Sequence, residues 1–170
     1  MRIAVLAALL VSAAIAVAGQ SSSDSKLQAQ LKQLFPAAAS FSPKEGQPPH
    51  FKAFSAPGVL AGYAFWTTEL EPLERAYDGP IKILVGMDTK GVLTGIIVVD
   101  HHEPYGNFSI DPPQFAAQFK GKSIRDPFKV GGDIDAVSRA TLSIASATRA
   151  VRDASRMMAR QFLNPENVKK

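Results

Sequence analysis

The chain has 170 residues, 46% of them hydrophobic and 20% charged, with a formal net charge of +4. This composition is too apolar for a disordered protein and predicts one globular domain with a buried core. The absence of cysteine excludes disulfides, thiolate zinc sites, cysteine-ligated iron–sulfur clusters and cysteine nucleophiles. Because the positive charge is modest and no aromatic residues are interleaved with it, we expect no nucleic-acid partner.

Residues 1–18 have the pattern of a secretory signal peptide. Met1 and Arg2 precede an apolar run, Ile3 to Ala16, which ends in small residues at the spacing that a signal peptidase accepts. The run is shorter than the about 20 residues that cross a bilayer, so cleavage after Ala18 is favoured over an uncleaved membrane anchor. We therefore expect an exported, periplasmic protein with no membrane span after removal of the signal.

Residues 19–50 are predicted to form a helix and a linker. A short helix capped by Asp24 or Ser25 would carry leucines at helical spacing and end at Phe35-Pro36. The linker follows as a segment rich in proline over 43–49.

Residues 51–170 form the predicted main domain, which begins with a β region. Strands are expected over 59–68, 81–87 and 92–99, because these runs are rich in β-branched and aromatic residues. The turn at 88–91, with the sequence Asp-Thr-Lys-Gly, predicts an antiparallel hairpin between the last two strands.

The rest of the domain is predicted to be largely helical. An irregular loop over 101–113 is followed by a short helix around 114–119 and a long helix from near Arg139 to Phe162. The long helix has an apolar stripe at spacings of three and four, formed by Ile144, Ala147, Val151, Ala154, Met158 and Phe162. These elements predict an α+β fold, with a small twisted, mainly antiparallel sheet packed against helices.

Another face of the long helix carries Arg149, Arg152, Arg156 and Arg160. A patch that binds phosphate or an acidic partner is one interpretation. We favour a solvated face on which Asp153 pairs with Arg149 and Arg156 at helical spacing.

The segment 135–141, with the sequence Asp-Ala-Val-Ser-Arg-Ala-Thr, opens the long helix. Ser138 is a plausible N-cap, which would place Thr141 at the third helical position among free backbone N–H groups. The helix dipole favours a phosphate there, Ala140 permits a close approach, and Arg139 could add a charge. Plain capping without a ligand is the alternative, and on capping alone it is favoured.

A second polar segment, 101–106, follows the last predicted strand. His101, His102 and Glu103 suggest a metal site, but neighbouring residues on a strand point to opposite faces, and the chain offers only His50 as a third imidazole. We therefore expect no metal. A loop that contacts a ligand is the better functional interpretation, and a simple polar turn is the alternative.

Taken together, these segments resemble the FMN-binding domain of the flavin subunits of Rnf-type and sodium-pumping NADH:quinone reductase complexes. The similarity is greater to the periplasmic flavin domain of NosR-type proteins. It extends from Gly62 to about Ala154, and is carried by Gly62-Tyr63-Ala64-Phe65, the strand pair 82–88 and 91–95, His101-His102-Glu103-Pro104, Val130-Gly131-Gly132-Asp133 and the segment 135–141.

The resemblance implies a covalent flavin. In such domains an ApbE-type flavin transferase recognises an Asp-x-x-Ser/Thr-Gly/Ala-Ala-Thr motif and joins FMN, drawn from FAD, to the last threonine as a phosphoester. Carried over, Thr141 is the attachment residue. The implied FMN-binding residues are Thr141, Ser138, Ala140, Asp135, Arg139, Glu103 and His102. The aromatic residues Tyr63, Trp66, Tyr105 and Phe108 are either ring contacts or core residues.

The chain departs from the family pattern at two places. Arg139 stands where the family usually has glycine or alanine, and Glu103 is followed directly by Pro104, Tyr105 and Gly106. The resemblance implies a periplasmic electron-transfer flavoprotein with a separate membrane or periplasmic redox partner, rather than a turnover enzyme. The alternative is a flavin-free module that assists maturation of an exported redox enzyme.

Overall fold

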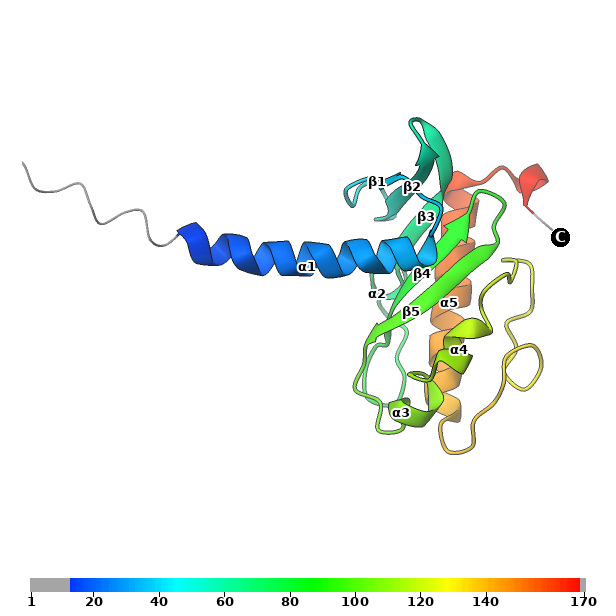
Figure 1. The fold of residues 1–170 in the computed structure, drawn as a ribbon. Coiled ribbons are helices and arrows are strands. Elements are labelled where there is room, and N and C mark those ends of the chain that lie inside the picture. Colours follow the sequence, from blue (N-terminus) through cyan, green and yellow to red (C-terminus); the bar gives the residue numbers. More distant parts are fainter. Residues whose placement is uncertain (1–12, 169–170) are drawn as a thin grey trace, which may run out of the picture.

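The computed structural model describes residues 13–168. Five consecutive antiparallel strands form one sheet, with helices on both of its faces (Figure 1). The elements are α1 (Ala13–Leu34), β1 (Ser40–Phe41), β2 (Phe51–Ala56), β3 (Val59–Trp66), α2 (Thr67–Leu70), β4 (Lys82–Asp88), β5 (Leu93–Asp100), α3 (Gly106–Ser109), α4 (Pro113–Ala117), α5 (Thr141–Phe162) and the 3-10 helix η1 (Pro165–Asn167). The strands lie in chain order, from β1 to β5. The α+β prediction is confirmed.

The N-terminal helix is longer than the sequence indicates. It was expected to begin at Asp24 or Ser25, but α1 begins at Ala13 and its first part projects away from the sheet (Figure 1). The predicted signal peptide lies mostly outside the described residues, and Ala18 falls within α1, so cleavage there stays a prediction. Within residues 13–168, no helix is both long enough and apolar enough to cross a membrane.

Helix α5 covers one face of the sheet and supplies most of the core. The predicted stripe is confirmed, since its members from Ile144 to Met158 are buried and Phe162 is half-buried against the same cluster. The stripe packs on strand residues such as Phe65, Ile83 and Val85, all fully buried. At about 25 cal/mol per Å² of apolar surface, this burial is the main source of stability and holds α5 rigidly against the sheet.

The end of α1 covers the opposite face. Leu31, Leu34 and Phe35 pack on Trp66 and Leu84 in a second, smaller cluster. The two clusters lie on opposite sides of the sheet because side chains alternate along each strand. The N-terminal segment therefore contributes a helix and strand β1 to the same layered structure.

The predicted hairpin is confirmed, whereas β1 and β2 were missed. Asp88 Oδ1 accepts hydrogen bonds from the backbone N–H groups of Lys90 and Val92, at 2.8 and 2.9 Å, and closes the turn between β4 and β5. Register shifts interrupt the pairing of β2 with β3, at Ala53/Phe54 and at Phe54/Ala56. Such irregularities break the strict alternation that marks a strand in the sequence.

Candidate functional site

Three segments distant in sequence meet at the buried carboxylate of Glu103. Its Oε1 accepts the Asp78 N–H at 2.8 Å, and its Oε2 accepts the Tyr77 N–H at 3.3 Å. The Ser143 hydroxyl donates to the same Oε2. Since Ser143 lies in the first turn of α5, Glu103 joins the loop after β5, the loop before β4 and the start of α5.

His101 holds the Glu103 loop in place. Its Nδ1 accepts the Glu103 N–H at 3.1 Å, so the ring proton lies on Nε2, which is 2.7 Å from Asp111 Oδ1. Gly106 packs directly against this ring, and a Cβ there would lie 2.1 Å from His101 Cε1. The predicted polar loop is thus an organised structure that supports Glu103.

Helix α5 begins at Thr141, two residues later than expected. The N-cap prediction for Ser138 is wrong, because Ala140 occupies the N-cap and no side chain among residues 13–168 caps the helix. The physical reason is a tight turn, closed by a 3.1 Å hydrogen bond from the Ala140 N–H to the Val137 carbonyl. Ser138 and Arg139 are its two central residues, which keeps the Ser138 side chain from the helix end. Thr141 is therefore the first helical residue, not the third.

Arg139 has a φ of 69°, in the left-handed region, at the third position of this turn. Turns with positive φ at that position favour glycine, which has no Cβ to clash with the backbone. The geometry thus explains why glycine suits this position and why arginine is an unusual occupant.

The helix start leaves several backbone donors without a hydrogen-bond partner among the described residues. Within residues 13–168, the backbone N–H groups of Thr141, Leu142 and Ser143 make no hydrogen bond outside the helix, and the first N–H groups of a helix have no partner within it. Thr141 is exposed, so its hydroxyl lies beside these donors at the positive end of the helix dipole. This arrangement suits a phosphate group.

A pocket of about 270 Å³ opens at this helix start. It is lined by Tyr77, Pro104, Tyr105, Arg139, Ala140, Thr141, Leu142 and Ser143. Several large apolar side chains around it are exposed, including Tyr77 at 71% and Leu142 at 62%. The rings of Tyr105 and Phe108, both partly exposed, lie 5.4 Å apart. Exposed apolar groups gathered around one pocket indicate a binding site for a ligand with a flat apolar part.

The structure brings some of the predicted residues together. Thr141, Ala140 and Arg139 line the pocket, and Glu103 anchors it through Ser143. The remaining three predicted residues are exposed and are not among the lining residues: His102, Ser138 and Asp135.

Tyr77 and Leu142 also line the pocket, although neither was expected there from the sequence. No spacing in the sequence predicts this position for Tyr77, because the segment that carries it is held at the pocket by hydrogen bonds from the Tyr77 and Asp78 N–H groups to Glu103. Of the aromatic candidates, Tyr63 and Trp66 are buried core residues, whereas Tyr105 lines the pocket.

The arginine face of α5 is paired differently from the prediction. Arg149 binds Glu74 at 2.7 Å and Arg152 binds Asp153 at 2.7 Å, while Arg156 donates to backbone carbonyls. The expected pairs of Asp153 with Arg149 and Arg156 are wrong, because both arginines bind groups from other segments and Asp153 binds its neighbour Arg152. Burial opposes ionisation of Glu74, but hydrogen bonds from Arg149 and Ser146 outweigh it and lower its pKa.

An open helix start, a hydroxyl and an aromatic rim define a site for a ligand that combines a phosphate with a planar ring. Residues 76–156 match the FMN-binding domain family. This stretch begins just before Tyr77 and includes Glu103 and Thr141, so the whole pocket lies within it. Over this stretch the chain is therefore similar to the FMN-binding domain family.

Several relatives are named as a subunit of an ion-translocating oxidoreductase complex. The one from Methanosarcina acetivorans is 29% identical over 137 residues, covering 73% of this chain and 70% of the relative. The one from Vibrio vulnificus is 32% identical over 87 residues, covering 45% and 41%. The one from Haemophilus influenzae is 41% identical over 49 residues, covering 29% and 22%. Against the two bacterial relatives, the chain thus matches less than half of their length.

The described residues fit FMN. The hydroxyl of the exposed residue Thr141 and the unpartnered N–H groups of the first turn suit its phosphate, and the rim of Tyr77, Tyr105 and Leu142 suits an isoalloxazine ring. Within residues 13–168, no group of three or more potential metal ligands lies together.

Proposed function

We propose that this protein is a periplasmic electron-transfer flavoprotein that carries FMN as a phosphoester on Thr141. The observation that carries the proposal is the position of Thr141, which is exposed as the first residue of α5 and lines the pocket. When bound, the flavin supplies one- and two-electron transfer, and the protein supplies attachment, orientation and polarity.

An ApbE-type flavin transferase is the proposed source of the cofactor. The Thr141 Oγ–phosphorus bond forms as the pyrophosphate bond of FAD breaks, AMP leaves, and the hydroxyl proton passes to a base of the transferase. Asp135 and Ser138 precede Thr141 by six and three residues and are exposed, so the transferase can contact them without unfolding the domain. Their role is recognition, which agrees with their position outside the pocket lining.

The redox partner is proposed to be a membrane or periplasmic protein. The apolar rim around the pocket would let such a partner approach the ring closely, since side chains of Tyr77 and Leu142 are largely exposed. The relatives named as part of an ion-translocating oxidoreductase complex support a place in an electron-transfer assembly.

The test is the mass of the protein after co-expression with an ApbE-type transferase. We expect a gain of one FMN, located to a peptide that contains Thr141, and its loss in Thr141→Ala. Thr141→Ser should keep part of the flavin, because the hydroxyl survives. Thr148→Val is the matched control, since Thr148 is buried within α5 and should not affect attachment.

Two outcomes would overturn the proposal. Covalent flavin on Thr141→Ala would place the attachment elsewhere. A folded, unmodified wild-type protein would instead favour the flavin-free maturation module, with Arg139 as the residue that blocks the transferase.

A further inference from the structure

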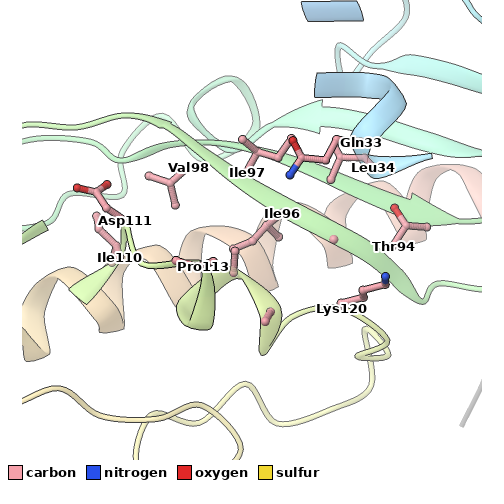
Figure 2. Close-up of a pocket in the computed structure, with 13 residues that line it drawn as sticks. Gln33, Leu34, Thr94, Ile96, Ile97, Val98, Ile110, Asp111, Pro113 and Lys120 are labelled. Atoms are coloured by element: carbon pink, nitrogen blue, oxygen red, sulfur yellow. The ribbon is translucent and has the colours of Figure 1, made fainter. Parts of the chain in front are cut away.

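A groove of about 440 Å³ runs along β5, the last strand of the sheet (Figure 2). Residues 94–98 of β5 line it, flanked by Leu34 at the end of α1 and by Pro113 in α4. Helices α1 and α4 therefore lie on either side of the strand edge and leave a slot between them. Thr141 does not line this groove, so the groove is separate from the proposed flavin site.

The outer edge of β5 is unpaired along most of its length. Leu93 exchanges backbone hydrogen bonds with Gly121 and Lys122, each at 2.8 Å. Beyond it, within the described part of the chain, residues 94–100 have no backbone hydrogen bonds on the side away from β4. The sequence at 94–99 is Thr-Gly-Ile-Ile-Val-Val, without the lysine or proline that commonly protects an exposed edge. Such an edge is a template for another strand.

Opposite charges mark the two ends of the groove. Lys120 lies toward the Thr94 end, and Asp111 lies toward the Val98 end (Figure 2). Lys120 has no ion-pair partner among residues 13–168. Asp111 Oδ1 pairs with His101 Nε2, and the Asp111 side chain remains 47% exposed. Both charges are therefore available to a ligand that lies along the strand.

We propose that this groove binds an extended segment of a partner protein, which adds to β5 as a sixth strand. The segment has apolar residues at alternate positions, an acidic residue at the Lys120 end and a basic residue at the Asp111 end. Its backbone pairs with the free edge, and its apolar side chains, all on one face of the added strand, pack on Ile96 and Val98, which lie on the same face of β5 and line the groove. The flanking helices favour a single extended chain over a second folded copy, whose own helices would meet them.

The experiment uses the synthetic peptide Lys-Thr-Val-Thr-Val-Thr-Glu with blocked ends and the purified protein. Run antiparallel to β5, this probe places its lysine near Asp111 and its glutamate near Lys120. We expect saturable binding and slower hydrogen exchange of backbone amides within residues 94–100, measured by NMR. The same peptide N-methylated at its five central residues should not bind, because it cannot donate to the strand edge.

Two variants test the charge pattern. Lys120→Glu should weaken binding of the probe by about fivefold, as expected for one exposed ion pair. Lys90→Glu is the matched control, since Lys90 is exposed in the β4–β5 turn outside the groove and should leave binding unchanged. Both variants should keep the flavin site intact.

The proposal fails if the probe leaves the amides of residues 94–100 unprotected at saturating concentration. It also fails if the N-methylated peptide binds as well as the probe. The same amides could instead become protected without the peptide as the protein concentration is raised and a dimer forms. The occupant would then be a second copy of the chain, and this outcome would likewise overturn the proposal.

Discussion

The start and the middle of α5 carry similar short motifs in opposite environments. Ser138 to Thr141 enters the helix, and Thr141 is exposed beside free backbone donors. Ser146 to Thr148 lies two turns further on, and Thr148 is 1% exposed, with a hydroxyl that has no hydrogen-bond partner among the described residues. The chemistry available to a threonine in α5 therefore depends on where the helix begins, because only the first turn combines an exposed side chain with unpartnered backbone N–H groups.

The largest expected effect concerns the anchor of the first turn. Glu103→Gln replaces one accepting oxygen with a donor, which faces the Asp78 N–H if it replaces Oε1 and the Tyr77 N–H beside the Ser143 hydroxyl if it replaces Oε2. We expect a loss of about 2–3 kcal/mol in the free energy of unfolding, because a buried donor is left unsatisfied. Urea unfolding measures it.

Glu69→Gln is the control for this variant. Glu69 forms a surface ion pair with Lys44 at 2.6 Å, which contributes about 1 kcal/mol at most. If the two variants lost equal stability, Glu103 would not be the anchor of the first turn.

The loop that leads into the first turn depends on Asp133. Burial opposes ionisation of its carboxylate, but hydrogen bonds from the Lys129 N–H at 2.5 Å and the Lys122 ammonium at 3.0 Å outweigh it, so its pKa is lowered. A lowered pKa means that the unfolded state binds the proton more tightly. The stabilisation is therefore complete above the ordinary aspartate pKa of about 4 and is lost as pH falls through the folded value.

Asp133→Asn should consequently cost about 1–2 kcal/mol of unfolding free energy at pH 7. The difference from wild type should shrink as pH falls below about 4, since the unfolded wild-type carboxyl is protonated first and the folded carboxyl only below its lowered pKa. Thermal unfolding at pH 7 and at pH 3 checks this. A difference that stays constant with pH would show that the charge of Asp133 does not matter.

In the middle of α5, Thr148→Val should stabilise the protein by about 1 kcal/mol. Valine keeps the shape of threonine and removes a buried hydroxyl that has no partner within residues 13–168. Chemical denaturation measures the gain. A loss of stability would mean that this hydroxyl is satisfied in solution, which would weaken the contrast with Thr141.

The smallest expected effect is at the entry to the first turn. Arg139→Gly should raise the free energy of unfolding by about 0.5–1 kcal/mol, because glycine adopts a φ of 69° without strain. Flavin attachment should be unchanged or increased. Arg139→Ala is the control, since it removes the rest of the side chain but keeps the Cβ. Calorimetry should show no increase in its free energy of unfolding.

Much of the fold follows from local patterns in the sequence. The stripe from Ile144 to Phe162 and the turn at 88–91 predict α5 and the β4–β5 hairpin, because helical spacing and turn residues act over a few positions. β2 escaped prediction because register shifts break its alternation. The start of α1 lies eleven residues earlier than the capping signal at Asp24 indicates.

The site, like the fold, has features that follow from local sequence and features that depend on the tertiary structure. By itself, the sequence predicted that a helix begins near the end of 135–141 and that this segment resembles the family motif, since both depend on residues adjacent in the chain. Only the tertiary structure decided that Ala140 caps the helix, that Glu103 ties Tyr77 and Ser143 together, and that Thr141 is exposed while Thr148 is buried. The physical reason is that hydrogen-bond partners and burial are set by segments up to 40 positions apart, which no local spacing encodes.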